Sequence, residues 1–195
     1  SPVYNEFHEV KNNILIPQFD APLVKSVQGT ILHYEIDWDV FKKQVKKAGM
    51  FLFCNPHNPL GIVFSRSDLL RMAETCLEND VLIVSDEIHS ELLLGGAAHT
   101  PIAALAPEIE ARTITLIAPS KTFNLAGLFT GFAIIPNPEL RGQYQKATEQ
   151  LIQHPNGFGL TAARVAFTQC DDWLAELRAY LTANRDALVQ FVDAH

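Results

Sequence analysis

The sequence predicts an α/β fold, a three-layer α/β/α sandwich with a mostly parallel central sheet. Short apolar runs at residues 50–54, 81–84 and 114–118 have the length and composition of buried strands. Amphipathic segments at 38–48 and 65–79 have the spacing of helices. The first precedes the run at 50–54, and the second lies between the runs at 50–54 and 81–84. Because strands that alternate with helices form βαβ units, the strands are expected to run parallel.

Length and composition place the chain among globular proteins. The 195 residues are 48% hydrophobic and 19% charged, enough for one sizeable core or for one domain plus part of another. A net charge of -7 argues against a nucleic-acid partner, which would need clustered Lys and Arg. No apolar run approaches the ~18 residues of a membrane span and no signal peptide opens the chain, so no membrane partner is expected.

Cysteine and histidine usage favours a cytoplasmic protein without a metal site. The three cysteines, Cys54, Cys76 and Cys170, are widely spaced and form no CxxC pair, as suits a reducing compartment. The histidines of the central region do not share a helical zinc spacing.

Each element can be justified in chain order. The first part predicts a short helix over 6–12, a strand over 14–18, a loop or weak strand over 22–30 and a strand over 33–37. In the helix expected over 38–48, Val40, Phe41 and Val45 recur at helical spacing, while four lysines face water. Ser65 or Ser67 can cap the helix over 65–79, and Asn79-Asp80 marks its end.

The remaining elements follow the same rules. The sequence predicts a helical turn at most over 107–112, a strand over 129–135, helices over 138–153 and 160–169 with a break at 155–159, and a last helix capped by Asp171 or Asp172. The apolar face of that last helix comprises Trp173, Leu177, Leu181, Leu188 and Val192. Since this helix pattern has no stop signal and the chain begins with Ser-Pro, the chain is expected to be cut from something longer.

Polar side chains of three chemical types follow the three buried runs. Asn55 to Asn58 follow the first, Asp86 and Glu87 the second, and Ser120-Lys121 the third. In a parallel sheet these positions share the carboxyl edge, where open α/β folds bind ligands. Taken singly, each has a plainer explanation: Asn-Pro pairs mark turns, Asp86 can cap a helix starting at Glu87, and Lys121 can be solvated.

An amine, a carboxylate and an amide together are what a pyridine aldehyde cofactor needs. The amine binds the aldehyde as an imine, the carboxylate keeps the ring nitrogen protonated, and the amide donates to the phenolic oxygen. The glycine-rich phosphate loops GxGxxG and GxxxxGK[ST] do not occur in the sequence.

The stretches NPHNPLG, SDEIHSEL and APSKTFNLAGL resemble the large domain of fold type I pyridoxal-phosphate enzymes, the class I/II aminotransferase superfamily. NPHNP, DEIH and SKTFNLAGL are similar, more narrowly, to the cystathionine β-lyase (C–S lyase) branch. The resemblance extends from SPVY to about Gln169. It implies a cofactor-binding large domain over 1–170, lacking its N-terminal segment, and over 171–195 the start of a long helix leading to a small domain absent from the chain.

The resemblance also implies the site residues. Lys121 would be the Schiff-base lysine and proton shuttle, Asp86 the partner of the pyridinium nitrogen, and Asn58 a donor to the cofactor O3′. Three further positions are assigned with alternatives: His89 near O3′ or merely on a helix face, Tyr4 stacked on the ring or merely packed, and Ser120 at the phosphate or in a turn. The cofactor implied is pyridoxal 5′-phosphate, and no metal is implied.

Two departures from the family pattern concern phosphate and substrate binding. Ala118 stands where many relatives have a serine, and Phe129 where many aminotransferases have a phosphate-binding arginine. The lyase branch tends to lack that arginine. The remaining phosphate partners and the arginine for the substrate carboxylate would lie outside this chain.

The sequence therefore predicts a pyridoxal-phosphate C–S β-lyase that acts on cystathionine-like amino acids as a cytoplasmic homodimer, with the isolated chain inactive. An aminotransferase remains open, because its motifs are the same. A non-catalytic binding module on the same fold also remains open, although intact Lys121, Asp86 and Asn58 argue against it.

Overall fold

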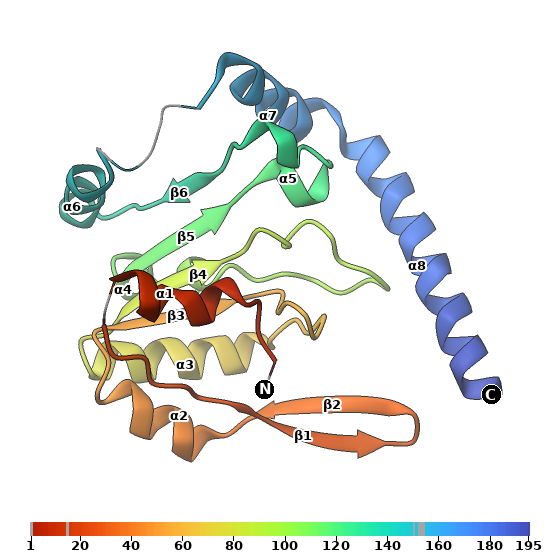
Figure 1. Ribbon diagram of the computed structural model, residues 1–195, viewed down its shortest axis with the longest axis horizontal. Coiled ribbons are helices and arrows are strands. Elements are labelled where there is room, and N and C mark those ends of the chain that lie inside the picture. Colours follow the sequence, from red (N-terminus) through yellow and green to blue (C-terminus); the bar gives the residue numbers. More distant parts are fainter. Residues whose placement is uncertain (1, 15, 150, 152–154) are drawn as a thin grey trace.

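A four-stranded sheet forms the centre of the computed structural model, which describes residues 2–14, 16–149, 151 and 155–195. Its strands are β3 (Met50–Cys54), β4 (Leu82–Asp86), β5 (Thr113–Ile117) and β6 (Phe132–Ile134), in that spatial order. The first three run parallel and β6 is antiparallel to β5, so the mostly parallel sheet is confirmed (Figure 1). Cys54 pairs with Asp86 and Asp86 with Leu116, which places the ends of three strands level with one another.

Two apolar clusters lie on opposite faces of this sheet, because successive strand residues point to opposite sides. Ile83 packs with α2 (Trp38–Val45), α3 (Arg66–Glu78), η1 (Ile102–Ala104) and α4 (Pro107–Glu110). Its neighbour Val84 packs on the other face, where α6 (Pro138–Thr148) contributes Leu140 and Tyr144. Helices therefore cover both faces, as the predicted sandwich requires.

Side-chain caps begin helices α2 and α3. Ser65 Oγ accepts a hydrogen bond from Asp68 N at 3.1 Å and caps α3, and Asn79 follows its last residue. Asp37 Oδ1 accepts from Val40 N at 3.0 Å and caps α2. These bonds satisfy backbone N–H groups that have no partner within the helix.

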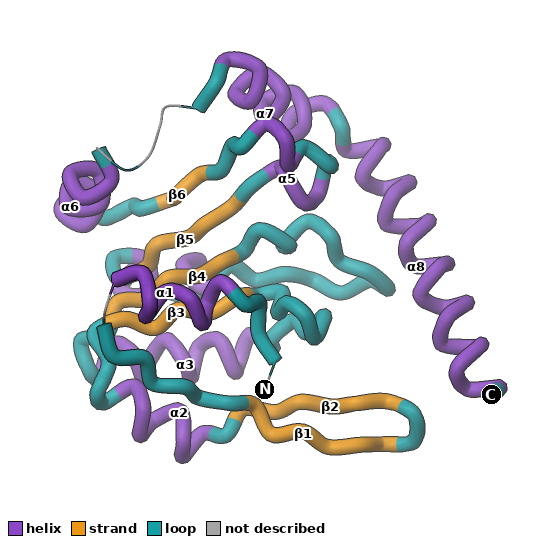
Figure 2. The backbone as a smooth tube through the Cα atoms, in the orientation of Figure 1, coloured by secondary structure: helices purple, strands orange, loops and turns teal. Residues whose placement is uncertain are grey.

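The N-terminal region agrees with its prediction over 6–12, 22–30 and 33–37 but not over 14–18. Helix α1 spans Glu6–Ile14, so the strand expected over 14–18 is wrong, and residues 16–20 have no regular secondary structure. Beyond them, β1 (Leu23–Gln28) and β2 (Ile31–Ile36) pair as a two-stranded hairpin of their own, beside α2 (Figure 2). An apolar pattern alone does not supply the neighbouring strand that a β-ladder needs.

Four later boundaries also differ. Phe129 has a left-handed backbone, φ 47°, after η2 (Ala126–Leu128), so β6 is shorter than the strand predicted over 129–135. Residues 119–122 form the short helix α5 (Pro119–Thr122), and α7 (Gly157–Gln169) begins earlier than expected because Asn156 caps it. Helix α6 ends at Thr148, and residues 150 and 152–153 of its predicted span lie outside the described residues. Cys170, which makes no side-chain cap bond, precedes α8 (Asp171–Ala194), so the predicted aspartate cap is wrong.

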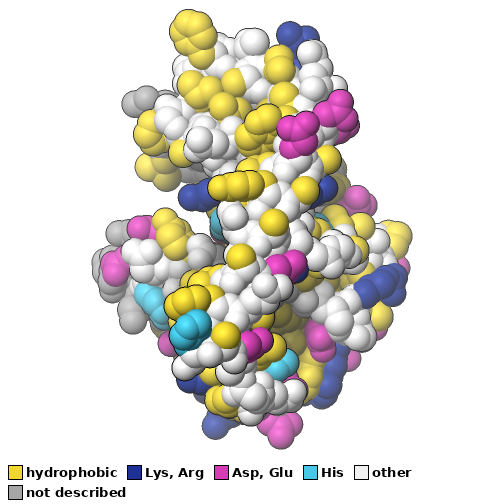
Figure 3. Space-filling model, turned by 90° about the vertical axis from the view of Figure 1, so that its right-hand side faces the viewer, with side chains coloured by type: hydrophobic (Ala, Val, Ile, Leu, Met, Phe, Trp, Pro, Cys, Tyr) yellow, Lys and Arg dark blue, Asp and Glu magenta, His cyan; other side chains and the backbone are white. Residues whose placement is uncertain are grey.

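Helix α8 packs against the body mainly through its first half. Leu174 is buried, Trp173 stacks on Phe123 with ring centroids 5.8 Å apart, and Arg178 Nε donates to Glu91 O at 2.7 Å. Hydrophobic side chains remain exposed along its second half, on the side of the molecule seen in Figure 3, namely Leu188, Val189, Phe191 and Val192. The predicted apolar face is therefore partly covered and partly exposed. Among the described helices, none combines the length and apolarity that crossing a membrane would need.

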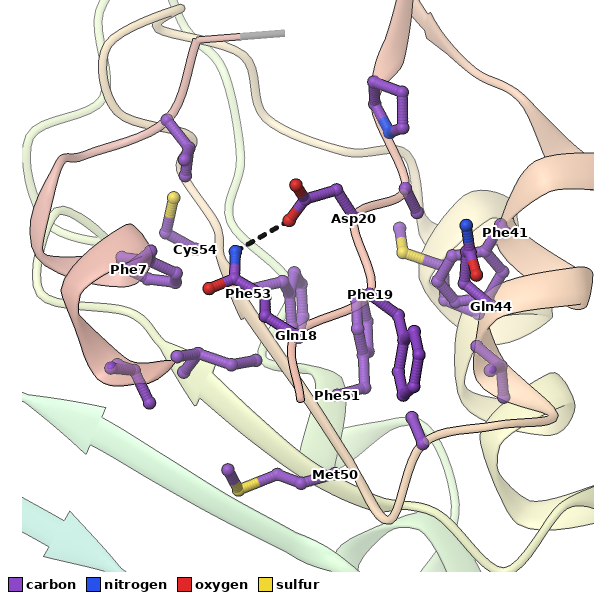
Figure 4. A pocket seen from close by; sticks show the side chains of 18 of the residues that line it. Phe7, Gln18, Phe19, Asp20, Phe41, Gln44, Met50, Phe51, Phe53 and Cys54 are labelled. Atoms are coloured by element: carbon purple, nitrogen blue, oxygen red, sulfur yellow. Dashed lines mark hydrogen bonds between the residues drawn. The ribbon is translucent and has the colours of Figure 1, made fainter. Parts of the chain in front are cut away.

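A cavity of about 730 Å³ lies beside β3, between that strand, α1, α2 and residues 16–22. Figure 4 shows the aromatic side chains that line it, from Phe7, Phe19, Phe41, Phe51 and Phe53. Gln18 Nε2 donates to Asp20 Oδ1 at 2.7 Å at its margin. Asp86, His89 and Lys121 are not among its lining residues, whereas Cys54, which pairs with Asp86 in the sheet, is.

Candidate active site

The side chains predicted to form a site lie at the carboxyl ends of β3, β4 and β5. Asp86 is the last residue of β4, Lys121 lies in α5 directly after β5, and Asn58 lies in the loop after β3. In Figure 1 these loops leave the sheet on the side that faces α8. The parallel direction of the three strands brings their ends to one edge.

Asp86 is a partly buried carboxylate with two basic side chains, His89 and Lys121, near it. Its Oδ1 accepts from Ile88 N at 3.2 Å, and residues 88–91 form a turn, so the alternative of a cap for a helix starting at Glu87 is wrong. Burial raises the pKa of Asp86, and this outweighs His89 and Lys121, whose positive charges would lower it. A carboxylate held in this way gains most from a cationic partner, because such a partner offsets its lost hydration.

His89 is coupled to the same pair. Burial lowers the pKa of His89, Asp86 acts to raise it, and Lys121 acts to lower it. These mutual effects indicate that the three side chains lie within electrostatic range of one another. His89 Nε2 is buried and has no hydrogen-bond partner in the described part of the chain. Because buried polar atoms are normally paired, this nitrogen is suited to a polar group of a ligand.

The loop after β3 is tied to the N-terminal segment. Tyr4 N donates to Asn58 O at 3.0 Å, which sets Tyr4 beside Asn58, and the Tyr4 side chain is exposed. Asn58 N in turn approaches Cys54 Sγ at 3.5 Å. Tyr4 and Asn58 are thus brought together by backbone contacts, and Cys54 connects them to the strand paired with Asp86.

Lys121 lies in the short helix α5. Pro119 occupies the first turn of α5, a position that suits a residue without a backbone N–H. Ser120 is half-buried, its carbonyl accepts from Leu125 N at 3.1 Å, and the Lys121 side chain is exposed. The amine is therefore accessible from the edge of the sheet.

Two polar residues near the site were missed by sequence reasoning. Burial is the largest cause that raises the pKa of the Cys54 thiol, and the nearby Asp86 charge acts in the same direction. Thr122 Oγ1 is buried and, within the described residues, has no hydrogen-bond partner. Cys54 directly precedes Asn55 and Thr122 directly follows Lys121, so adjacency to the strand ends was the available signal.

These features fit a pyridine aldehyde phosphate. An accessible amine, a partly buried carboxylate and an imidazole nitrogen without a partner among the described residues converge at one edge, and these are the groups that would bind an aldehyde, a ring nitrogen and a phenolic oxygen. Among the described residues no cluster of three or more His, Cys, Asp or Glu side chains could hold a metal ion.

Nearly the whole sequence, and not only the site residues, is similar to known proteins. The family model of class I and II aminotransferases matches residues 1–194. Cystathionine beta-lyase PatB of Bacillus subtilis is 39% identical over 162 residues, covering 82% of this chain and 42% of PatB. The aspartate aminotransferase of Geobacillus stearothermophilus is 30% identical over 147 residues, covering 75% of this chain and 37% of that enzyme.

The fold agrees with a solved structure along almost all of its length. Cystalysin from Treponema denticola, whose crystal structure contains pyridoxal 5′-phosphate, superposes with a TM-score of 0.91 at 30% identity, covering 98% of this chain and 48% of that one. The chain spans about half the length of the curated relatives it matches. With nearly every residue matched by the family model, the chain belongs to the family of class I and II aminotransferases.

Proposed function

We propose that this chain forms the cofactor-binding part of a pyridoxal-phosphate-dependent C–S β-lyase that acts on cystathionine-like amino acids. Residues 1–170 would form the cofactor-binding domain, and residues 171–195 a helix leading out of it. The observation that carries the proposal is the placement of Asp86 at the end of β4 and of Lys121 directly after β5, with His89 near enough for its charge to affect Asp86. Cystathionine β-lyase and C–S lyase relatives support this branch of the family.

Each residue would have a distinct task. Lys121 Nζ would hold the cofactor aldehyde and, once displaced by the substrate amine, would accept the proton from the substrate Cα. Asp86 would keep a proton on the ring nitrogen. When bound, the cofactor supplies an electron sink that stabilises negative charge at Cα.

The remaining residues would orient the ring. Asn58 and His89 would donate to the phenolic oxygen, Tyr4 would stack on the ring, and Ser120 would contact the phosphate. The buried His89 Nε2, which has no hydrogen-bond partner among the described residues, supports its part in this assignment. Loss of the Cα proton together with a thiolate from Cβ, followed by hydrolysis, yields pyruvate, ammonia and a thiol.

Aminotransfer is the second candidate, because an aspartate aminotransferase and other aminotransferases are similar to this chain. The same residues would then return the proton to the cofactor side instead of expelling a thiolate. A non-catalytic binding module is the third candidate, and the cofactor spectrum separates it: no absorbance band near the visible after adding pyridoxal phosphate would favour the module. A homodimer and a cytoplasmic location stay predictions.

The deciding experiment measures products from the holoenzyme with cystathionine, with and without a keto acid. We expect pyruvate and ammonia to form without the keto acid, and a thiol to form in equal amount. Amino transfer that depends on the keto acid, without pyruvate, would make the aminotransferase the better assignment. The Lys121→Ala variant is the control, since it should abolish either activity.

A further inference from the structure

Three buried polar side chains adjoin the strand ends of the candidate site and have no task in the proposed reaction. Asn55 follows β3 and is 1% exposed, and Glu87 follows β4 and is 2% exposed. The side chain of His99, from the loop before η1, is 9% exposed. Burying such groups is unfavourable unless their hydrogen bonds are satisfied, so their arrangement requires an explanation.

The three side chains form one hydrogen-bonded chain. Asn55 Nδ2 lies 3.5 Å from His99 Nδ1, and His99 Nε2 lies 2.7 Å from Glu87 Oε2. Both ends of the chain accept from fixed donors. Phe64 N donates to Asn55 Oδ1 at 3.1 Å, while Ser85 Oγ and Ile102 N donate to Glu87 Oε1 at 2.9 and 3.3 Å.

These end contacts determine where each proton lies in the hydrogen bonds between Asn55, His99 and Glu87. Because Asn55 Oδ1 faces Phe64 N, the Asn55 amide presents its NH₂ group to His99, so His99 Nδ1 must accept. His99 is then neutral with its proton on Nε2, and it donates to an ionised Glu87. The hydrogen-bonded chain of Asn55, His99 and Glu87 carries one negative charge. Its hydrogen bonds can run in only one direction, from Asn55 to Glu87.

The chain fixes the peptide groups around Asp86. Asn55 N donates to Asp86 O at 3.0 Å, and Glu87 N donates to Leu116 O at 2.9 Å. Ser85 and Glu87 flank Asp86 in the sequence and are joined to each other through their side chains. The backbone on both sides of Asp86 is therefore anchored to buried groups, while its own carboxylate remains directed by Ile88 N.

We propose that Asn55, His99 and Glu87 act as one positioning unit that holds Asp86 in place for the cofactor ring and keeps a second negative charge near it. This inference rests on the role proposed above for Asp86. Burial is the main cause that raises the pKa of Asp86, and the Glu87 charge adds to it. A second anion in this position favours a protonated ring nitrogen opposite Asp86.

The direction of the chain makes a specific test possible. In Glu87→Gln, the amide oxygen can keep the hydrogen bonds from Ser85 Oγ and Ile102 N, and the new NH₂ group then faces His99 Nε2. His99 must then move its proton to Nδ1, where it meets the Asn55 NH₂ group. Rotating either amide only moves the conflict to Ile102 N or Phe64 N, so one buried donor is always left without an acceptor.

Adding Asn55→Asp removes that conflict. The carboxylate introduced at position 55 would accept from both Phe64 N and His99 Nδ1, while the amide introduced at position 87 would donate to His99 Nε2. All donors are satisfied again, the direction of the chain is reversed, and the total charge returns to one negative. In the single variant Asn55→Asp, His99 would lie between two carboxylates. It could satisfy both by carrying a proton on each ring nitrogen.

The experiment compares the protein and the variants Glu87→Gln, Asn55→Asp and the double variant, first without cofactor. We expect the unfolding equilibrium constant of Glu87→Gln to rise about tenfold or more, and the double variant to recover most of that loss. Nitrogen-15 spectra of labelled histidine should show the His99 proton on Nε2 in the parent protein and on Nδ1 in the double variant. Glu110→Gln, at an exposed position of α4, is the control and should change neither property.

Titration with pyridoxal 5′-phosphate then tests the effect on Asp86. Affinity should fall about tenfold in Glu87→Gln and recover with Asn55→Asp. A double variant that is less stable than both single variants, or that fails to fold, would overturn the hydrogen-bonded chain. Recovery of stability without recovery of affinity would overturn the positioning of Asp86. If the parent protein binds no cofactor at all, the proposed function fails, whereas the stability and the histidine spectra still test the chain.

Discussion

Replacing Asp86 by Asn tests the carboxylate on which the proposed function depends. The substitution keeps the size of the side chain and the oxygen that accepts from Ile88 N, so the turn after β4 should persist. What is lost is the negative charge near His89 and Lys121. The proposed partner of that charge is the protonated ring nitrogen of the bound cofactor. Removing one partner of such a buried ion pair costs about 3–5 kcal/mol, which corresponds to about a 10²- to 10⁴-fold loss in kcat/KM with cystathionine.

Asn58→Ala provides the comparison within the same site. Loss of one hydrogen bond to the ring oxygen should cost only about 1–3 kcal/mol, so Asp86→Asn is expected to be the more damaging change. Asp39→Asn, at an exposed position of α2, is the control that should leave kcat/KM unchanged. Equal and mild losses in Asp86→Asn and Asn58→Ala would refute the role given to Asp86.

The same substitution should have the opposite effect on cofactor-free stability. Because burial raises the folded-state pKa of Asp86 above its unfolded value, the folded protein holds this proton more tightly, and its stability falls as the pH rises through that window. Asp86→Asn removes this penalty. Urea unfolding without cofactor should therefore show a stabilising effect that grows as the pH rises above about 4, the range in which the unfolded carboxyl is ionised. A destabilising effect at neutral pH would contradict this account of its burial.

Three further predictions concern other residues. Borohydride reduction of the cofactor complex followed by peptide mapping should label Lys121, and label on Lys25 or Lys146 instead would exclude it as the attachment point. Since burial lowers the folded-state pKa of His89 below its unfolded value, the protein should lose stability as the pH falls through about 6.5; His89→Asn should reduce that loss in urea unfolding, and the exposed-site variant His8→Asn should not. Gly159→Ala should destabilise the protein by about 1–3 kcal/mol, because the added Cβ would collide with Thr130 Oγ1 and approach Leu128 O at 3.0 Å. Gly157→Ala, where a Cβ meets nothing within 4 Å, is its control, and equal effects of the two glycine variants in thermal unfolding would argue against the close approach of α7 to residues 128–130.

The sequence by itself determined the features that depend on neighbouring residues in the chain. The apolar run at 50–54 coincides with β3, and Ser65 caps α3 as expected, because both signals span only a few residues. The candidate side chains Asn58, Asp86 and Lys121 were found for the same reason, since each lies at or just after the end of a buried apolar run. Resemblance of the motifs around them then indicated the family.

Only the tertiary structure decided which side chains meet across the sequence. Residues 16–18 were predicted to be part of a strand over 14–18 but lie beside a cavity instead of in the sheet. His99 lies 12 residues from Glu87 and 44 from Asn55 in the sequence. No local sequence pattern predicts that these three side chains form one hydrogen-bonded chain. The unpaired nitrogen of His89 likewise depends on what packs around it. Local propensity and periodicity specify elements, whereas contacts between distant residues arise from the packing of these elements around the sheet.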